Sequence, residues 1–219
     1  MCFSSKNVQL RHFSPLKTEK SMLFKHIKSN LEVLDSEFDS IYPKDILEAS
    51  EMHFTPIIIA KIAARYLVDG KESKILDVGS GAGKFCMIGS ACTDGYFVGV
   101  ELRENLSTAA TLIAEYYNLS NVEFIHSNIT AIKFKDYNGF YFYNPFYENV
   151  CLSGRIDETV ELRRDLFDEY SLYVKEQLSE MPIGTKLVTY FSYLKEIPDS
   201  YKVHFSSFDN KLKMWEKVS

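Results

Sequence analysis

The spacing of apolar residues along the chain alternates between the period of a helix and that of a buried strand. Short apolar runs bounded by glycine or polar residues predict strands at KILDVG, YFVGVEL, VEFIHSN, GFYFYNPF and KLVTYFSY, in that order. Before and between these runs, apolar residues recur at helical spacing in IIIAKIAARYLV, KFCMIGSAC, residues 103–118 and residues 157–181. Strands and helices therefore alternate through most of the chain.

The end of the chain follows another pattern. The segment YKVHFSSFDNKLKMWEKV predicts two strands joined by a turn at DN. Strands that alternate with helices imply right-handed crossovers and a mainly parallel sheet covered on both faces. We therefore predict an α/β fold with a doubly wound, mostly parallel seven-stranded sheet and an antiparallel C-terminal hairpin strand at or near one edge.

The first 50 residues differ from the rest. Residues 1–20 are polar, basic and aperiodic, which indicates an arm, whereas residues 21–50 show helical spacing interrupted at Pro43. We expect an N-terminal arm and helical extension over residues 1–50 and a main domain over residues 51–219. Thr55 and Pro56 predict the start of the domain's first helix, with Thr55 as the cap.

The chemistry of this domain is suggested by the glycine-rich turn after the first predicted strand, in ILDVGSGAGKF, residues 75–85. Glycine allows positive φ and lets a ligand approach the backbone, and the N-terminus of the following helix offers free N–H groups. The spacing fits neither a P-loop, because Phe85 follows Lys84, nor a dinucleotide fingerprint, because Gly83 comes one position early. A glycine-rich turn that binds no ligand is the remaining alternative.

The pattern D-x-G-x-G-x-G after an apolar strand resembles the first motif of the class I S-adenosylmethionine-dependent methyltransferases. The resemblance covers about residues 55–219 and implies a Rossmann-like sheet ending in an antiparallel strand. It also implies S-adenosyl-L-methionine as the cofactor. The positions that match the motif, and would bind the cofactor, are Asp77, Gly79, Ser80, Gly81 and Gly83.

The same resemblance extends to three further positions. Glu101 closes the second predicted strand 22 residues after Gly79, where an acid in the family holds the cofactor's ribose hydroxyls. Asn128 matches the polar residue placed against the adenine amine, although a turn-capping role explains an asparagine there nearly as well. Thr55 matches a threonine near the methionine end of the cofactor in histone-methylating relatives. His126 is expected to point into the packing of the sheet.

The fourth predicted strand ends in Asn144, Pro145, Phe146 and Tyr147. This stretch resembles the N-P-P-Y motif of methyltransferases that modify planar nitrogens, in which the asparagine oxygen and the proline carbonyl accept hydrogen bonds from the acceptor nitrogen. The four residues are therefore the candidate catalytic residues. Phe146 stands where the motif has its second proline, which leaves room for other acceptors such as lysine amines. Alternatively, the stretch simply ends a strand.

Composition bears on the partners and the location of the protein. The net charge of −5 argues against a broad nucleic-acid surface, although basic residues in the N-terminal arm could contact phosphates. Four scattered cysteines predict neither a metal site nor a disulfide framework. No apolar run approaches the ~20 residues that span a bilayer. We expect a cytoplasmic protein without a metal or a membrane partner.

These observations predict an S-adenosylmethionine-dependent methyltransferase. The acceptor is expected to be a nitrogen of a protein side chain, of lysine or glutamine type, or of a nucleic-acid base, and the negative charge slightly favours protein. The alternatives are a small-molecule methyltransferase and a catalytically inactive cofactor-fold binding module. A dinucleotide oxidoreductase fits less well because of the glycine spacing.

Overall fold

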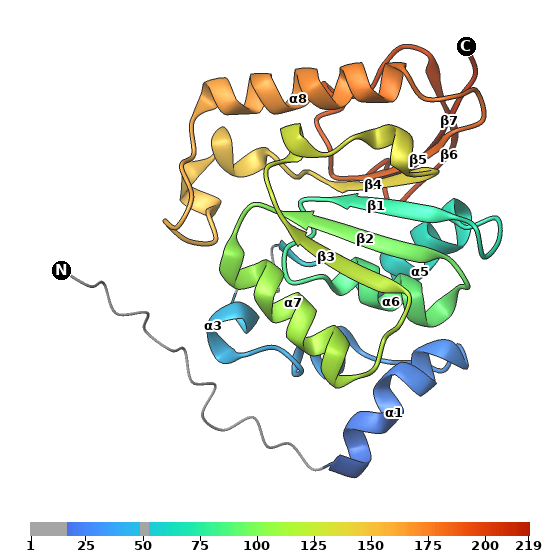
Figure 1. The fold of residues 1–219 in the computed structure, drawn as a ribbon, viewed down its shortest axis with the longest axis vertical. Helices are drawn as coiled ribbons and strands as arrows, with labels where there is room; N and C mark the ends of the chain where they lie inside the picture. The colour runs from blue at the N-terminus through green and yellow to red at the C-terminus, as the bar shows by residue number, and fades with distance from the viewer. Residues whose placement is uncertain (1–16, 49–52) are drawn as a thin grey trace.

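The computed structural model describes residues 17–48 and 53–219 and contains a seven-stranded sheet with the order β3-β2-β1-β4-β5-β7-β6 (Figure 1). The first five strands pair in parallel, and β7 pairs antiparallel with both β5 and β6. The strands are β1 Lys74–Val78, β2 Tyr96–Glu101, β3 Val122–His126, β4 Gly139–Tyr143, β5 Lys186–Tyr190, β6 Tyr201–Ser207 and β7 Leu212–Lys217. The predicted fold class and its closing hairpin are confirmed.

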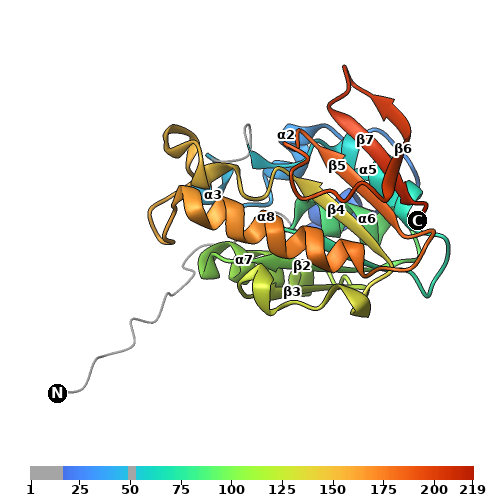
Figure 2. The ribbon, with the colours of Figure 1, turned by 90° about the horizontal axis from the view of Figure 1, so that it is seen from above.

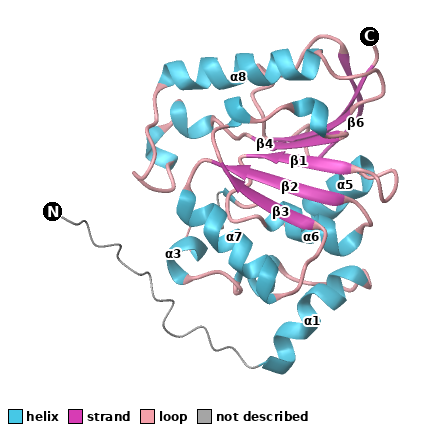
Figure 3. Ribbon diagram, in the orientation of Figure 1, coloured by secondary structure: helices cyan, strands magenta, loops and turns pink. Residues whose placement is uncertain are grey.

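Helices cover both faces of the sheet (Figures 1 and 3). The sheet lies between two apolar clusters, one on each face. One face carries α5 Ile57–Leu67, α6 Lys84–Cys92 and α7 Glu104–Tyr116, and the other carries α8 Arg164–Ser179. Four of the five residues of β1 are fully buried because helices cover both faces of this central strand, which explains its continuous apolar run. Among the described residues, no helix is long and apolar enough to cross a membrane.

The hairpin of β6 and β7 lies beyond β5, at the end of the sheet farthest from β3 (Figure 2). Its turn contains three consecutive residues with positive φ, namely Phe208, Asp209 and Asn210. Asp and Asn tolerate this conformation better than most residues, which is why the dipeptide DN marks the turn in the sequence. The edge strand β6 is exposed over most of its length.

In the described part of the chain before α5 lie α1 Lys17–Lys28, α2 Asp35–Asp39 and α3 Lys44–Leu47. Apolar side chains from this region, including Ile27 and Phe38, are fully buried in the cluster that also contains α5 and α6. The buried Lys84 at the start of α6 forms ion pairs of 2.6 Å with Asp35 and Asp39. Of the arm predicted over residues 1–20, residues 1–16 lie outside the described residues, and residues 17–20 belong to α1.

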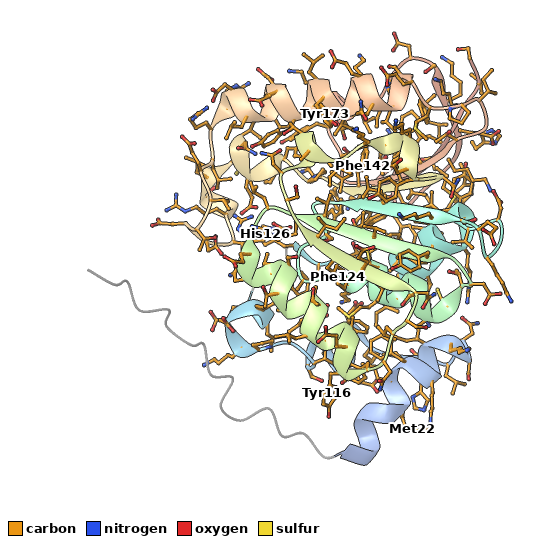
Figure 4. All side chains as sticks on the ribbon, in the orientation of Figure 1. Met22, Tyr116, Phe124, His126, Phe142 and Tyr173 are labelled. Atoms are coloured by element: carbon orange, nitrogen blue, oxygen red, sulfur yellow. The ribbon has the colours of Figure 1, made fainter. Side chains whose placement is uncertain are left out.

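The structure corrects three expectations about individual segments. Thr55 does not cap α5, because its hydroxyl shares a hydrogen bond of 3.0 Å with the Tyr141 hydroxyl; the N-cap residue is Pro56. The helix predicted from residue 157 begins at Arg164, and the preceding residues form a loop. His126 is exposed at the end of β3, and its ring nitrogen lies 3.0 Å from the Leu102 carbonyl oxygen (Figure 4).

Candidate functional site

A pocket of about 730 Å³ opens at the carboxyl ends of the parallel strands. Residues at the ends of β1, β2, β4 and β5 line it: Val78, Glu101, Tyr143 and Tyr190. Parallel α/β sheets bind ligands at this edge because the loops that leave the strand ends converge there. Most of the residues that the sequence singled out border this pocket, and the glycine turn forms part of its floor.

The three glycines of the turn all have positive φ, but the space beside each of them differs. A Cβ on Gly79 would lie 2.8 Å from the Pro145 Cβ, and one on Gly83 would lie 2.4 Å from the Phe124 ring. Gly81, with φ of 54°, has no atom within 4 Å of where its Cβ would be, and it lines the pocket. Packing therefore requires Gly79 and Gly83 to be glycine, whereas the space beside Gly81 is open to a ligand.

Glu101 lies at the end of β2 with its carboxylate oriented by two backbone amides. The N–H of Gly81 donates to Oε2 at 2.9 Å, and the N–H of Arg103 donates to Oε1 at 2.8 Å. The residue is 7% exposed, and burial raises the pKa of its carboxyl group even though the two amides oppose this shift. Each oxygen keeps lone-pair capacity for a further donor, such as a sugar hydroxyl.

Besides Gly83, three predicted cofactor residues lie outside the pocket lining. Asp77 is buried under the turn, where the Cys86 thiol donates to its Oδ2 at 3.5 Å, and burial raises its pKa to about 8. The Ser80 hydroxyl is buried without a hydrogen-bond partner among the described residues. Thr55 is paired with Tyr141, as described above. In this structure, these side chains support the turn and the sheet.

Asn128 lines the pocket and also caps a turn. Its Oδ1 accepts hydrogen bonds of 3.0 Å from the backbone N–H and the hydroxyl of Thr130, and its Nδ2 donates to the Tyr170 hydroxyl at 3.0 Å. The turn-capping alternative is therefore correct for the Oδ1 atom. Asn128 nevertheless borders the pocket, next to the buried Ile129.

Asn144 directly follows β4 and has an unusual backbone conformation. Its φ is 43°, in the left-handed region that asparagine tolerates better than most residues. The following Pro145 packs against Gly79, so the glycine turn and this segment form one continuous wall. Within the described residues, no group hydrogen-bonds to the Asn144 side-chain amide, and the residue lines the pocket. A strained backbone and a free amide at the edge of a pocket are typical of a functional position.

The two aromatic residues of this stretch have different surroundings. Phe146 is 7% exposed and packs against Tyr170 of α8, with ring centroids 5.5 Å apart. Tyr147 faces Tyr193 at 5.9 Å. On the other side of Asn144, Tyr143 packs against Tyr190 at 4.9 Å, and Phe191 extends this group. All of these rings line the same pocket as Asn144.

Sequence reasoning missed the ion-pair network at this edge. Arg103 is 5% exposed, and its guanidinium makes two parallel hydrogen bonds with Glu148, of 2.9 and 3.0 Å, and a third with Asp157 at 2.9 Å. Glu148 is therefore held in an ion pair. Burial lowers the pKa of the neighbouring His53, so its imidazole is neutral near pH 7.

These features fit S-adenosylmethionine. The open side of Gly81 leaves room for a ligand next to the backbone, and Glu101 presents oriented carboxylate oxygens to it. Aromatic side chains provide much of the rest of the pocket lining. Among residues 17–48 and 53–219, no group of three or more His, Cys, Asp and Glu side chains is arranged to hold a metal ion.

No protein-family model matches the sequence, and no curated protein sequence matches it. Solved structures do match in fold. An RNA methyltransferase from Salinibacter ruber in complex with S-adenosyl-L-homocysteine is 17% identical with a TM-score of 0.53, and the match covers 74% of this chain and 92% of that one. TrmN from Thermus thermophilus is 13% identical with a TM-score of 0.56, over 78% of this chain and 52% of that one.

A putative methyltransferase from Escherichia coli, yhhF, is 14% identical with a TM-score of 0.51, and the match covers 74% of this chain and 83% of that one. The present chain thus spans nearly all of the Salinibacter protein but about half of TrmN. At these identities the likeness concerns the fold. Together with the sheet order and the antiparallel β7, it shows that the chain has the Rossmann-like fold of class I S-adenosylmethionine-dependent methyltransferases.

Proposed function

We propose that this protein is an S-adenosylmethionine-dependent methyltransferase. The observation that supports this most directly is the pairing of Gly81 and Glu101. The open side of the glycine and the carboxylate that its N–H orients border the same pocket, at the strand ends where this fold binds ligands. The glycine spacing disfavours a dinucleotide in this position.

The roles of the residues follow from their chemistry. Glu101 accepts hydrogen bonds from the ribose hydroxyls, and the backbone at Gly79 and Gly81 allows the ligand to approach closely. The bound cofactor supplies a sulfonium-activated methyl group, so the protein needs no covalent nucleophile. The Asn144 oxygen accepts a hydrogen bond from the acceptor nitrogen, which orients its lone pair and limits its motion. The surrounding aromatic rings exclude water.

The acceptor that fits this arrangement best is a planar nitrogen of a nucleic-acid base. The pocket that Asn144 lines is also lined by two groups of aromatic rings, and a flat base can stack on either of them. The Salinibacter protein of the same fold is an RNA methyltransferase, which supports the same class. The net charge of −5 favours the second candidate, a planar amide of a protein side chain.

Calorimetry with S-adenosylhomocysteine and with NAD tests the cofactor. We expect binding of the former, and we expect Glu101→Ala to weaken it by about 1–3 kcal/mol, the value of a lost hydrogen bond to a charged group. Glu104→Ala, at an exposed acidic residue three positions away, is the matched control and should leave affinity unchanged. Binding of NAD without S-adenosylhomocysteine would contradict the proposal.

Radiolabelled methyl transfer onto a fractionated cell lysate, scored separately for RNA, protein and small molecules, tests the acceptor. Label in RNA supports a base, label in protein supports the amide, and label in small molecules supports neither. Asn144→Ala should lower turnover and spare cofactor affinity. Asn118→Ala controls for backbone strain, because Asn118 is also left-handed, with φ of 54°, but follows α7. Equal turnover in the two variants would remove Asn144 from the mechanism.

A further inference from the structure

One wall of the pocket is a segment without an α-helix or a strand. Residues 148–162, between β4 and α8, contain only short 3-10 turns and loop (Figure 3). Four of them line the pocket in addition to Glu148 and Asn149: Gly154, Ile156, Val160 and Leu162. We call this segment the pocket wall. Because it lacks the hydrogen-bond ladder of a regular element, its position depends on contacts with the rest of the protein.

The Arg103 guanidinium makes several of these contacts. It binds Glu148 at the start of the wall through two hydrogen bonds and Asp157 in its middle through a third. Both carboxylates also accept hydrogen bonds from backbone amides of the wall. Glu148 accepts one from the Ile156 N–H at 2.6 Å, and Asp157 accepts one from the Thr159 N–H at 3.0 Å. One side chain thereby ties two points of the wall to the segment that follows β2.

Arg103 is also connected to the proposed cofactor ligand. Its backbone N–H donates to Glu101 at 2.8 Å, so the same residue orients the ribose carboxylate with its main chain and the wall with its side chain. The guanidinium is almost fully buried, and Glu148 is only 14% exposed at its side chain. Buried charge-assisted hydrogen bonds of this kind hold geometry firmly, and breaking them leaves an unpaired buried charge.

We propose that Arg103 is a positioning residue that holds the pocket wall over the cofactor and so strengthens cofactor binding. This inference rests on the proposed function for the identity of the ligand. Lysine cannot replace arginine in this role, because its single ammonium group lacks the planar fork that bonds both oxygens of Glu148 while reaching Asp157. The wall should therefore loosen even when the positive charge is kept.

The test compares the wild-type protein with Arg103→Lys and with the double variant Arg103→Gln/Glu148→Gln, which removes the buried charge pair in case the single variant folds poorly. Arg163→Gln is the matched control, because Arg163 lies next to the wall but makes exposed ion pairs with Glu161 and Asp165. Trypsin cleavage after Arg155, which lies inside the wall, reports wall mobility. Calorimetry reports the affinity for S-adenosylhomocysteine.

We expect Arg103→Lys and the double variant to bind S-adenosylhomocysteine roughly tenfold or more weakly, as the loss of hydrogen bonds to a charged group implies. In the wild type, the ligand should slow cleavage after Arg155, and in both variants cleavage should be faster and this protection reduced. Arg163→Gln should resemble the wild type in ligand affinity and in cleavage after Arg155.

Unchanged affinity in both variants would overturn the inference, whether or not cleavage becomes faster, because the wall would then have no effect on the ligand. Unchanged cleavage would overturn it as well. A wild-type protein that binds no S-adenosylhomocysteine would instead contradict the proposed function. The cleavage rates without ligand would then decide by themselves whether Arg103 holds the wall.

Discussion

Two buried carboxyl groups, Asp77 and Glu101, lie near each other under the glycine turn but have different partners. Glu101 receives two backbone N–H groups, which favour its charged form. Asp77 receives the weaker S–H donor of Cys86, and burial together with the charge of Glu101 raises its pKa to about 8. At neutral pH, Asp77 is therefore mostly a neutral acid that belongs to the core.

This difference predicts a pH dependence of stability. Between the unfolded value of 3.8 and the folded value of about 8, the native state holds a proton on Asp77 that the unfolded chain has released. The stabilising contribution is complete below about pH 4 and is lost as the pH rises toward about 8. Asp77→Asn removes the titration, so its stability relative to the wild type should increase with pH, by at most about 1.4 kcal/mol per pH unit.

Urea unfolding of both proteins between about pH 5 and about pH 8 measures this difference. Asp94→Asn, at an exposed aspartate, serves as the control. A constant difference between the wild type and Asp77→Asn over this range would show that Asp77 is ionised in the folded protein.

At the scale of the element, the turn after β1 uses glycine for two purposes. Gly79 and Gly83 contact Pro145 and Phe124, so any side chain there would collide with the protein itself. Gly81 has free space, so a side chain there would collide only with a ligand. Backbone strain and contact with a ligand can be separated at Gly81 by substitution, because Gly184 also has positive φ and free space beside it.

Gly81→Ala and Gly184→Ala form this matched pair. Both residues have positive φ, 54° and 87°, and neither has an atom within 4 Å of the added Cβ. Each substitution should lower the free energy of unfolding by about 1–2 kcal/mol, the cost of the left-handed conformation for alanine. Calorimetry should find weaker S-adenosylhomocysteine binding in Gly81→Ala alone. Equal affinities in the two variants would show that the ligand does not approach Gly81.

At the scale of the whole molecule, the N-terminal helices are joined to the start of α6 through a buried cation. Lys84 is 3% exposed and bridges Asp35 and Asp39, and Asp35 also accepts a hydrogen bond from the Ile57 N–H at the start of α5. The helices before the sheet and the helix after the glycine turn thus share one electrostatic centre as well as one apolar cluster.

Lys84→Met should destabilise the protein by on the order of 3–5 kcal/mol, because it leaves Asp39 buried without its cation. Lys195→Met is the control, since Lys195 pairs with Asp168 at an exposed site and its loss should cost less than about 1 kcal/mol. The double variant Lys84→Met/Asp39→Asn should recover part of the loss. Urea unfolding measures all three, and a cost for Lys84→Met as small as that of the control would contradict this account.

The sequence was most informative where structure depends on neighbouring residues. The apolar run of β1, the helix KFCMIGSAC and the DN turn all occur where the pattern predicts them. The predicted start of α8, at residue 157, was wrong. Asp157 is hydrogen-bonded to Arg103 in the pocket wall, and the helix begins only at Arg164. Thr55 was misassigned as a cap for a similar reason, because its hydroxyl pairs with Tyr141 on β4.

The sequence by itself determined the alternation of strands and helices, the closing hairpin and the position of the glycine turn, because each depends on local periodicity or local φ. Only the tertiary structure decided which charges pair and which glycine faces the pocket. Arg103 and Glu148 are 45 residues apart, and Lys84 and Asp35 are 49 apart. The identity of such partners depends on how the folded sheet brings its strand ends together, which periodicity along the chain does not encode.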